Sequence, residues 1–243
     1  MIDILALRYN NNGYTQAGLL TRGSLHSEGE AAILRIVAGK YGGRYIKAPG
    51  GAATRPTAQN VREALFNIIA SQVPGAVFID LFAGSGAVGI EALSRGARAA
   101  VFAERDRMRV RIIKDNLANL GIKDEQAPVF ALDLTQASAF DTLKSGLGRL
   151  DAEAAGIIFA DPPYDLAGLC ELPGRILESA ICAAGGAIIV EHRNKTDMPR
   201  NAGISTDGTA GWALAQVRKY GDTCLSFYCG TNAINTEVGG NGR

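Results

Sequence analysis

The chain has 243 residues, of which 47% are hydrophobic and 20% charged, and this predicts one globular domain with a substantial core. No apolar run reaches membrane-spanning length, and the start lacks a secretory pattern, so we expect no membrane association. The four cysteines form no CxxC pair, which argues against structural zinc, any other metal centre and a disulfide framework. Reduced thiols would fit a cytoplasmic protein. The net charge of +1 does not by itself indicate a nucleic-acid partner.

The first part of the chain shows three segments. Residues 1–31 are polar and rich in Asn, Gly and Ser, and we expect a poorly ordered extension there. Residues 33–37 and 44–46 flank a glycine-containing turn, which predicts a small β-hairpin. After a glycine-rich loop, Thr57 is expected to N-cap a helix that runs to Ala70 with apolar residues on one face.

This hairpin-and-helix region, residues 32–73, is basic. Six cations and no Asp or Glu lie between Arg35 and Arg62: Arg35, Lys40, Arg44, Lys47, Arg55 and Arg62. Unopposed cations at this density can contact phosphates of a nucleic acid. The alternative is a solvated basic face of the hairpin and helix, and charge alone does not decide between the two.

Strands and helices alternate from residue 74 to residue 230. We expect strands at 76–81, 99–103, 129–132, 156–160 and 187–191, and helices ending near 94, at 106–120 and at 172–183. This order predicts a mostly parallel sheet with right-handed crossovers. Residues 212–220 and 224–228 alternate around Gly221-Asp222 and predict a C-terminal antiparallel hairpin, which makes the sheet seven-stranded. Residues 231–243 are expected to form a loose tail.

A glycine turn follows the first strand of this sheet. Its glycines, in the segment Asp80-Leu81-Phe82-Ala83-Gly84-Ser85-Gly86, permit close approach of the backbone to a ligand. Glu104 ends the second strand, where an acid can bind ribose hydroxyls. Together with Gly89 the turn also satisfies GxGxxG, so a nicotinamide cofactor is a competing interpretation.

Two further acids favour a different cofactor. Asp80, just before the turn, would repel a pyrophosphate but suits a cationic sulfonium and an amino group. Asp133 follows the third strand and is placed to meet an adenine amino group, although it can equally be a helix N-cap. These features favour S-adenosylmethionine. The candidate cofactor-binding residues are Asp80, Phe82, Ala83, Gly84, Gly86, Glu104 and Asp133.

The most informative motif is Asp161-Pro162-Pro163-Tyr164, directly after the apolar strand 156–160. In an open α/β sheet, ligands bind where strands end. A carboxylate and a proline carbonyl can accept the hydrogens of a nucleobase amino group, while the aromatic ring stacks on the base. The alternative is a strand-ending turn in which Asp161 or Asp165 is an N-terminal helix acid. We take these four residues as the candidate catalytic motif.

The chain resembles the RsmD-like family of bacterial 16S ribosomal RNA guanine-N(2) methyltransferases. The resemblance covers about residues 35–228 and rests on motifs in the family's order: Arg35-Ile36-Val37-Ala38-Gly39, Gly43-Arg44, Arg55-Pro56-Thr57, Val61-Arg62-Glu63, Leu65-Phe66-Asn67, Phe82-Ala83-Gly84-Ser85-Gly86 and Asp161-Pro162-Pro163-Tyr164. Two of these motifs, Arg55-Pro56-Thr57 and Val61-Arg62-Glu63, make the match specific. The glycine turn and the Asp-Pro-Pro-Tyr motif also occur in other families.

The resemblance implies a Rossmann-like methyltransferase domain at 74–230, with an N-terminal appendage that contacts RNA. It implies S-adenosylmethionine as the methyl donor, and 16S rRNA within the small ribosomal subunit or an assembly intermediate as the partner. Arg55 and Thr57 match the family's stretch beside the active site and join the expected RNA contacts. We expect a monomer. A DNA adenine amino-methyltransferase, a nicotinamide oxidoreductase and a non-catalytic RNA-binding assembly factor remain alternatives.

Overall fold

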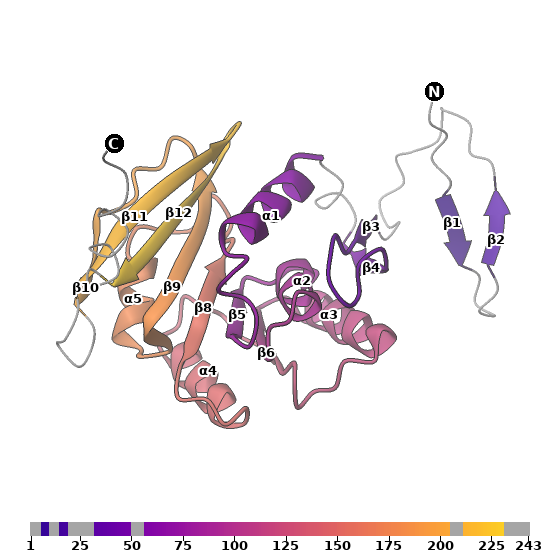
Figure 1. The fold of residues 1–243 in the computed structure, drawn as a ribbon, viewed down its shortest axis with the longest axis horizontal. Helices are drawn as coiled ribbons and strands as arrows, with labels where there is room; N and C mark the ends of the chain where they lie inside the picture. Colours follow the sequence, from indigo (N-terminus) through magenta and orange to yellow (C-terminus); the bar gives the residue numbers. More distant parts are fainter. Residues whose placement is uncertain (1–5, 10–14, 19–31, 50–55, 205–210, 231–243) are drawn as a thin grey trace, which may run out of the picture.

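The computed structural model describes residues 6–9, 15–18, 32–49, 56–204 and 211–230. A single large sheet forms the centre of the protein (Figure 1). Its strands are β5 (Val77–Leu81), β6 (Ala99–Glu104), β7 (Val129–Ala131), β8 (Ala155–Ala160), β9 (Cys182–Arg193), β10 (Asn201–Ile204), β11 (Gly211–Tyr220) and β12 (Thr223–Gly230). They lie in the order β10-β11-β12-β9-β8-β5-β6-β7.

The sheet is parallel from β7 to β9 and antiparallel beyond. Strand β5 pairs in parallel with both β6 and β8, and β9 is parallel to β8. Strand β12 joins β9 antiparallel and forms a hairpin with β11. The expected α/β fold is therefore confirmed. The sheet has eight strands, however, because β10 adds to the edge beside β11, in a stretch with no strand pattern in the sequence.

Helices cover both faces of the sheet, as a parallel sheet requires. The helices are α1 (Pro56–Ile68), α2 (Ala87–Ser94), α3 (Arg107–Leu120), α4 (Ser138–Gly148) and α5 (Leu172–Glu178). The first three share one apolar core with one face of the sheet, and α4 and α5 share a second core with the other. Of the helices in the described part of the chain, none combines the length and apolar character that crossing a membrane requires.

Two helix boundaries differ from the expectations, and one helix was not expected. Helix α1 begins at Pro56, so Thr57 lies inside its first turn and is not the N-cap. Helix α4 was not expected, although Phe140, Leu143 and Leu147 are buried along one side of it. Helix α5 ends at Glu178 rather than at residue 183, because the backbone at Ala180 takes a positive φ of 54° and β9 begins two residues later.

The expected N-terminal hairpin is present as β3 (Ala32–Arg35) and β4 (Tyr45–Ala48). The buried carboxylate of Glu91, on α2, holds the chain that follows β3, accepting hydrogen bonds from the backbone N–H of Val37 at 2.8 Å and of Ala38 at 3.1 Å. A buried charge needs such partners, because an unpaired one is costly. Arg95, one turn along α2, also pairs with Glu91 at 2.8 Å.

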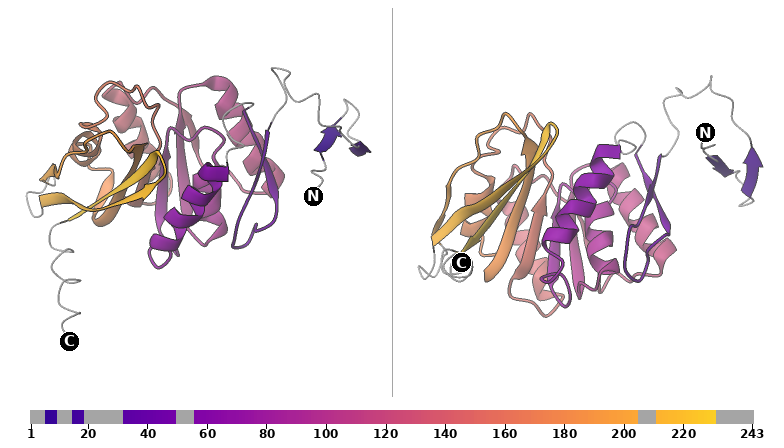
Figure 2. Two further views of the ribbon diagram at one scale, coloured as in Figure 1. Left: turned by 90° about the horizontal axis from the view of Figure 1, so that it is seen from above. Right: turned by 45° about the horizontal axis from the view of Figure 1, so that its top comes forward.

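Two more polar side chains fix the hairpin. Ser94, at the end of α2, accepts the N–H of Tyr41 at 2.9 Å and donates to the carbonyl of Ala38. Asn116, on α3, bonds both the N–H and the carbonyl of Lys47, each at 2.8 Å. In Figure 2 the hairpin lies beside the helices of this face. The hairpin and α1 therefore share one core with the sheet. The boundary expected between the appendage (32–73) and the methyltransferase domain (74–230) does not separate two cores.

The remaining expectations concern the termini. Within residues 1–31, β1 (Ala6–Tyr9) and β2 (Thr15–Gly18) pair as an antiparallel hairpin that the sequence did not lead us to expect. The other residues of that stretch lie outside the described part of the chain, as do residues 231–243.

The contact between the turn of the N-terminal hairpin and α2 generates a prediction. Gly39 has a φ of +80°, and an added Cβ would come within 1.8 Å of the carbonyl oxygen of Ser94. Gly75 has nearly the same φ, +77°, but a Cβ there meets nothing within 4 Å. Gly75→Ala should lower the free energy of unfolding by about 1–2 kcal/mol through backbone strain.

Gly39→Ala should cost a further ~1–3 kcal/mol, because the turn must move away from α2. Urea unfolding of the two variants measures the difference. Faster amide hydrogen exchange at Val37 and Tyr41 in Gly39→Ala alone would locate the additional loss of stability at the hairpin. Equal losses of stability in both variants would show that docking on α2 contributes nothing.

Candidate active site

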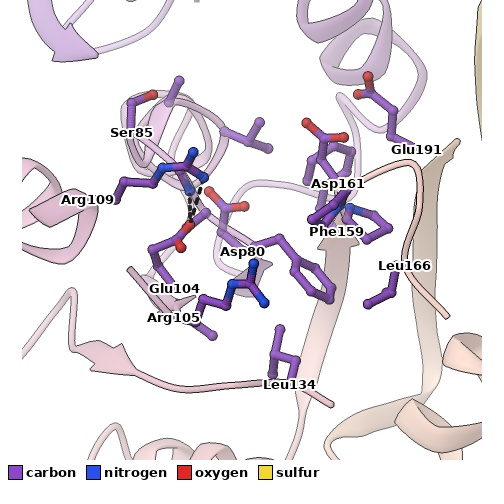
Figure 3. Close-up of a pocket in the computed structure, with 18 of the residues that line it drawn as sticks. Asp80, Ser85, Glu104, Arg105, Arg109, Leu134, Phe159, Asp161, Leu166 and Glu191 are labelled. Carbon is purple, nitrogen blue, oxygen red and sulfur yellow. Dashed lines mark hydrogen bonds and ion pairs between the residues drawn. The ribbon is translucent and has the colours of Figure 1, made fainter. Parts of the chain in front are cut away.

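A cavity of about 530 Å³ opens at the carboxyl ends of the parallel strands. It lies where the chain order of the sheet reverses, since β6 and β7 extend from one side of β5 and β8 from the other. Such switch points are where open α/β sheets bind ligands. Figure 3 shows the carboxylates and arginines that face the cavity.

The glycine turn after β5 forms one side of the cavity. Phe82 has a φ of 60°, an uncommon conformation for a residue with a side chain, and Gly84 and Gly86 are also left-handed at 56° and 77°. The N–H of Gly86 donates to the carbonyl of Ala83 at 2.7 Å, which closes the turn at the start of α2. The backbone of the turn therefore borders the cavity at Gly84, which has no side chain.

Asp80 is 2% exposed at the end of β5, yet it lines the cavity. Its Oδ2 accepts the N–H of Gly89 at 2.8 Å. Burial raises the pKa of Asp80 well above its usual range, and the charges of Asp161 and Glu104 raise it further. Gly89 is needed because a Cβ there would overlap the ring of Phe102 on β6 at 2.3 Å.

Glu104 ends β6 next to the glycine turn. One carboxylate oxygen accepts the N–H of Gly84 and the other accepts the N–H of Asp106, each at 2.9 Å. The guanidinium of Arg109 lies 4.0 Å from the same carboxylate. These partners fix the orientation of Glu104 at the edge of the cavity.

Asp133 follows β7 and also lines the cavity. Its Oδ1 accepts two hydrogen bonds from Thr135, from the backbone N–H at 3.0 Å and from the hydroxyl at 2.8 Å. These bonds lower the pKa of Asp133. Helix α4 begins later, at Ser138, so Asp133 closes a local turn and does not cap that helix.

The Asp161-Pro162-Pro163-Tyr164 motif directly follows β8. The backbone N–H of Asp161 donates to the carbonyl of Leu81 at 3.4 Å, so the motif begins beside the glycine turn of β5. The carbonyl of Pro163 accepts the N–H of Leu166 at 2.9 Å. Within the described residues the carbonyl of Pro162 has no such donor, so it keeps its capacity to accept one.

Tyr164 is 46% exposed beside the cavity. The guanidinium of Arg193, at the end of β9, lies over its ring at 4.6 Å from the centroid. This cation–π contact orients the ring and covers one of its faces.

A second acid, Glu191 on β9, lies next to Asp161. Loss of hydration among the surrounding protein atoms raises the pKa of Asp161 to about 6. Burial raises the pKa of Glu191 to about 8, and the charge of Asp161 contributes to this shift. The two carboxyls therefore titrate as an interacting pair.

The expected phosphate-contacting residues do not all lie on one surface. Arg35, Lys40 and Arg44 are exposed on the hairpin, and Arg44 also donates to the carbonyl of Asn119 at 2.7 Å. Arg62 is 7% exposed and donates to the carbonyl of Arg35 at 3.0 Å, so it belongs to the wall of the cavity and not to an open basic face. Arg55 and the side chain of Thr57 lie outside the described part of the chain.

Several cavity residues were not expected from the sequence: Arg105, Arg109, Leu134, Phe159, Leu166 and Glu191. Glu191 had a signal, since it is an acid at the end of an apolar strand, as Glu104 is. Arg105 and Arg109 had none, because cations near a helix start are common on surfaces.

His192 has a structural role. His192 is buried, its Nδ1–H donates to the carbonyl of Arg193, and its Nε2 accepts the hydroxyl of Ser226, each at 2.8 Å. Over the described ranges, no group of three or more His, Cys, Asp or Glu residues is arranged to hold a metal ion.

Comparisons with known proteins identify the family. The family model described as conserved hypothetical protein 95 matches residues 34–229. Ribosomal RNA small subunit methyltransferase D of Escherichia coli K12 is 34% identical over 196 residues, which cover 80% of this chain and 89% of that protein.

Solved structures show the same fold. The yhhF protein of Escherichia coli is 31% identical, with a TM-score of 0.63 over 81% of this chain and 97% of that one. A hypothetical protein of Thermus thermophilus is 32% identical, with a TM-score of 0.63 over 80% of this chain and 98% of that one. The chain therefore belongs to the family described as conserved hypothetical protein 95 and has the fold of a methyltransferase.

Proposed function

We propose that the protein transfers a methyl group from S-adenosylmethionine to the exocyclic amino group N2 of a guanine in small-subunit ribosomal RNA. One observation carries the proposal: the Asp161-Pro162-Pro163-Tyr164 motif lies beside a glycine turn flanked by two buried carboxylates, in one cavity. The relative named ribosomal RNA small subunit methyltransferase D supports RNA as the substrate class.

The residues of the cavity fit the cofactor. The left-handed Gly84 lines the cavity and leaves room for a ligand against the backbone, whereas Gly86 packs on Ile113 and Phe102 and shapes the turn from behind. Glu104 is a fixed acceptor for ribose hydroxyls, and Asp133 keeps one carboxylate oxygen available for an amino group. The acidic side chains of Asp80 and Asp161 suit a cation, because a bound positive charge favours their ionised forms. Bound here, S-adenosylmethionine would supply an electrophilic methyl group on a sulfonium centre.

Asp161 and Pro162 act on the target amino group. The amino nitrogen of guanine is a poor nucleophile because its lone pair is delocalised into the ring. The carboxylate of Asp161 and the carbonyl of Pro162 accept hydrogen bonds from its two N–H groups, direct its lone pair and stabilise the positive charge that develops on nitrogen. As the new N–C bond forms, S-adenosylhomocysteine leaves, and the nitrogen returns to neutral by giving one N–H proton to the carboxylate of Asp161. Alignment of the two reactants in the cavity contributes further.

Tyr164 holds the base outside its RNA stack. Extrusion costs a few kcal/mol, and stacking on an aromatic ring returns about 1–3 kcal/mol. Since Arg193 covers one face of Tyr164, the base stacks on the other.

We assign further phosphate contacts to Arg35, Lys40 and Arg44 on the hairpin, with Arg55 and Thr57 as expected neighbours. We further propose a cytoplasmic monomer that acts on the small subunit or on an assembly intermediate.

The proposal is tested by methyl transfer from tritiated S-adenosylmethionine to unmethylated small-subunit particles, with DNA as the alternative substrate. Nucleoside analysis should recover the label as N(2)-methylguanosine from the particles and none from DNA. In parallel, S-adenosylhomocysteine at 100 times its Kd should stabilise the protein by about 2.7 kcal/mol, whereas NAD should not. Label in methyladenine, or stabilisation by NAD alone, would overturn the proposal.

Asp161→Ala should reduce the rate of methyl transfer by roughly 10²–10³-fold, because the amino group loses its charged acceptor. Binding of S-adenosylhomocysteine, measured by calorimetry, should stay largely unchanged. Asp165→Ala, an exposed acid in the same loop, is the matched control and should retain full activity. Equal loss of transfer and cofactor binding in Asp161→Ala would indicate a folding role instead.

The pH dependence follows from the pKa of Asp161, which is about 6. Below that pH the carboxyl is protonated and loses acceptor capacity for the amino hydrogens. We therefore expect kcat/KM to fall as the pH is lowered from 7 to 5, with an apparent pKa near 6, as measured in single-turnover and steady-state assays. A flat profile across this range would exclude ionised Asp161 from the reaction.

A further inference from the structure

Glu191 lies in the proposed active site but has no role in the mechanism above. The β8–β9 register pairs Ala160 with Val190, so Asp161 and Glu191 are at the same level on neighbouring parallel strands. Phe159 and Ile189, two residues earlier on each strand, both belong to the core on the α1 face. Because side chains alternate along a strand, Asp161 and Glu191 project toward that same face, where both line the cavity.

Within the described part of the chain, no hydrogen bond to the side chain of Glu191 is formed. Its neighbour in the cavity is another acid, Asp161, and the pKa of Glu191 is raised by burial first and by the charge of Asp161 second. A half-buried carboxyl group without a partner is unfavourable, and native structures rarely keep one without a reason. A ligand that brings hydrogen-bond donors would satisfy it.

Guanine presents donors in the required arrangement. Its N1–H lies directly beside the N2 amino group, so two acceptors placed next to each other can hold both. Neighbouring parallel strands are about 4.8 Å apart, which allows side chains from β8 and β9 to reach the same edge of one base. Adenine has an acceptor at N1 and no amino group at C2, so it cannot present these two donors side by side.

We infer that Glu191 selects guanine by accepting a hydrogen bond from N1–H, beside the amino group that Asp161 holds. This assignment rests on the proposed function and adds a specificity-determining residue to it. The contact does not depend on ionisation, because a neutral carboxyl group also has an acceptor oxygen. A neutral Glu191 can in addition donate its O–H to O6 of the same base.

The test uses small subunits reconstituted with 16S rRNA that carries one of two bases at the nucleotide the wild-type protein methylates. One is guanosine, and the other is 2-aminopurine riboside, which keeps the N2 amino group but lacks N1–H and O6. Tritiated methyl transfer gives kcat/KM for each substrate. The measured quantity is the ratio of kcat/KM for guanosine to kcat/KM for 2-aminopurine.

Glu191→Ala should lower this ratio by about tenfold or more, because a hydrogen bond to a charged or buried group is lost with guanosine only. Glu191→Gln should keep the ratio within a few-fold of the wild-type value, since an amide also presents an acceptor and a donor side by side. Glu178→Ala, an exposed Glu outside the cavity, is the control and should leave the ratio unchanged.

The outcomes separate the inference from the proposed function. If Glu191→Ala slows both substrates equally, the ratio stays constant, Glu191 is only structural, and the inference is overturned while the function stands. If the wild-type protein methylates neither the native particle nor the guanosine particle, the proposed function fails and takes the inference with it. Binding of S-adenosylhomocysteine to each variant, measured by calorimetry, confirms that the cofactor site is intact.

Discussion

The parallel pairing of β5 with β8 is the constraint on which the site depends. These strands are separated by more than seventy residues in the chain, yet their paired ends place the glycine turn beside the Asp-Pro-Pro-Tyr motif. The reversal of strand order at β5 leaves a crevice there that no crossover helix fills. A ligand on the turn therefore lies next to whatever follows β8, and the position of the carboxylate of Asp161 follows from topology.

The cavity gathers acidic side chains at a cost in stability. Loss of hydration disfavours the ionised forms of Asp80, Asp161 and Glu191, and the charge of Asp161 adds to the penalty for Asp80 and Glu191. A fold selected only for stability would avoid three acids on adjacent strands. Their presence is explained by ligands that carry positive charge or amino hydrogens, as a sulfonium and a nucleobase do. The same electrostatics would support both the proposed methyl donor and the proposed recognition of guanine.

The N-terminal hairpin is built into the domain by polar contacts as well as apolar ones. Glu91, Ser94 and Asn116 all use side-chain atoms to satisfy the hairpin backbone. Asn116 also donates to the carbonyl of Ser85 in the glycine turn at 3.0 Å. The hairpin that carries the proposed phosphate contacts is thus linked directly to the turn proposed to bind the cofactor, so both keep a fixed relation across the cavity.

The sequence by itself determined the local features. Apolar runs bounded by glycine and proline located β5, β6 and β8 to within a residue or two, and residue spacing identified Asp80, Glu104 and Asp161 as cavity candidates, because these signals come from neighbours in the chain. The sequence did not locate β10 or α4, whose patterns are short or interrupted by glycine. Tertiary structure decided that Arg62 is buried, that Arg193 covers Tyr164 and that Glu191 lies beside Asp161. Each of these contacts joins residues distant in sequence, and only strand order and register bring them together.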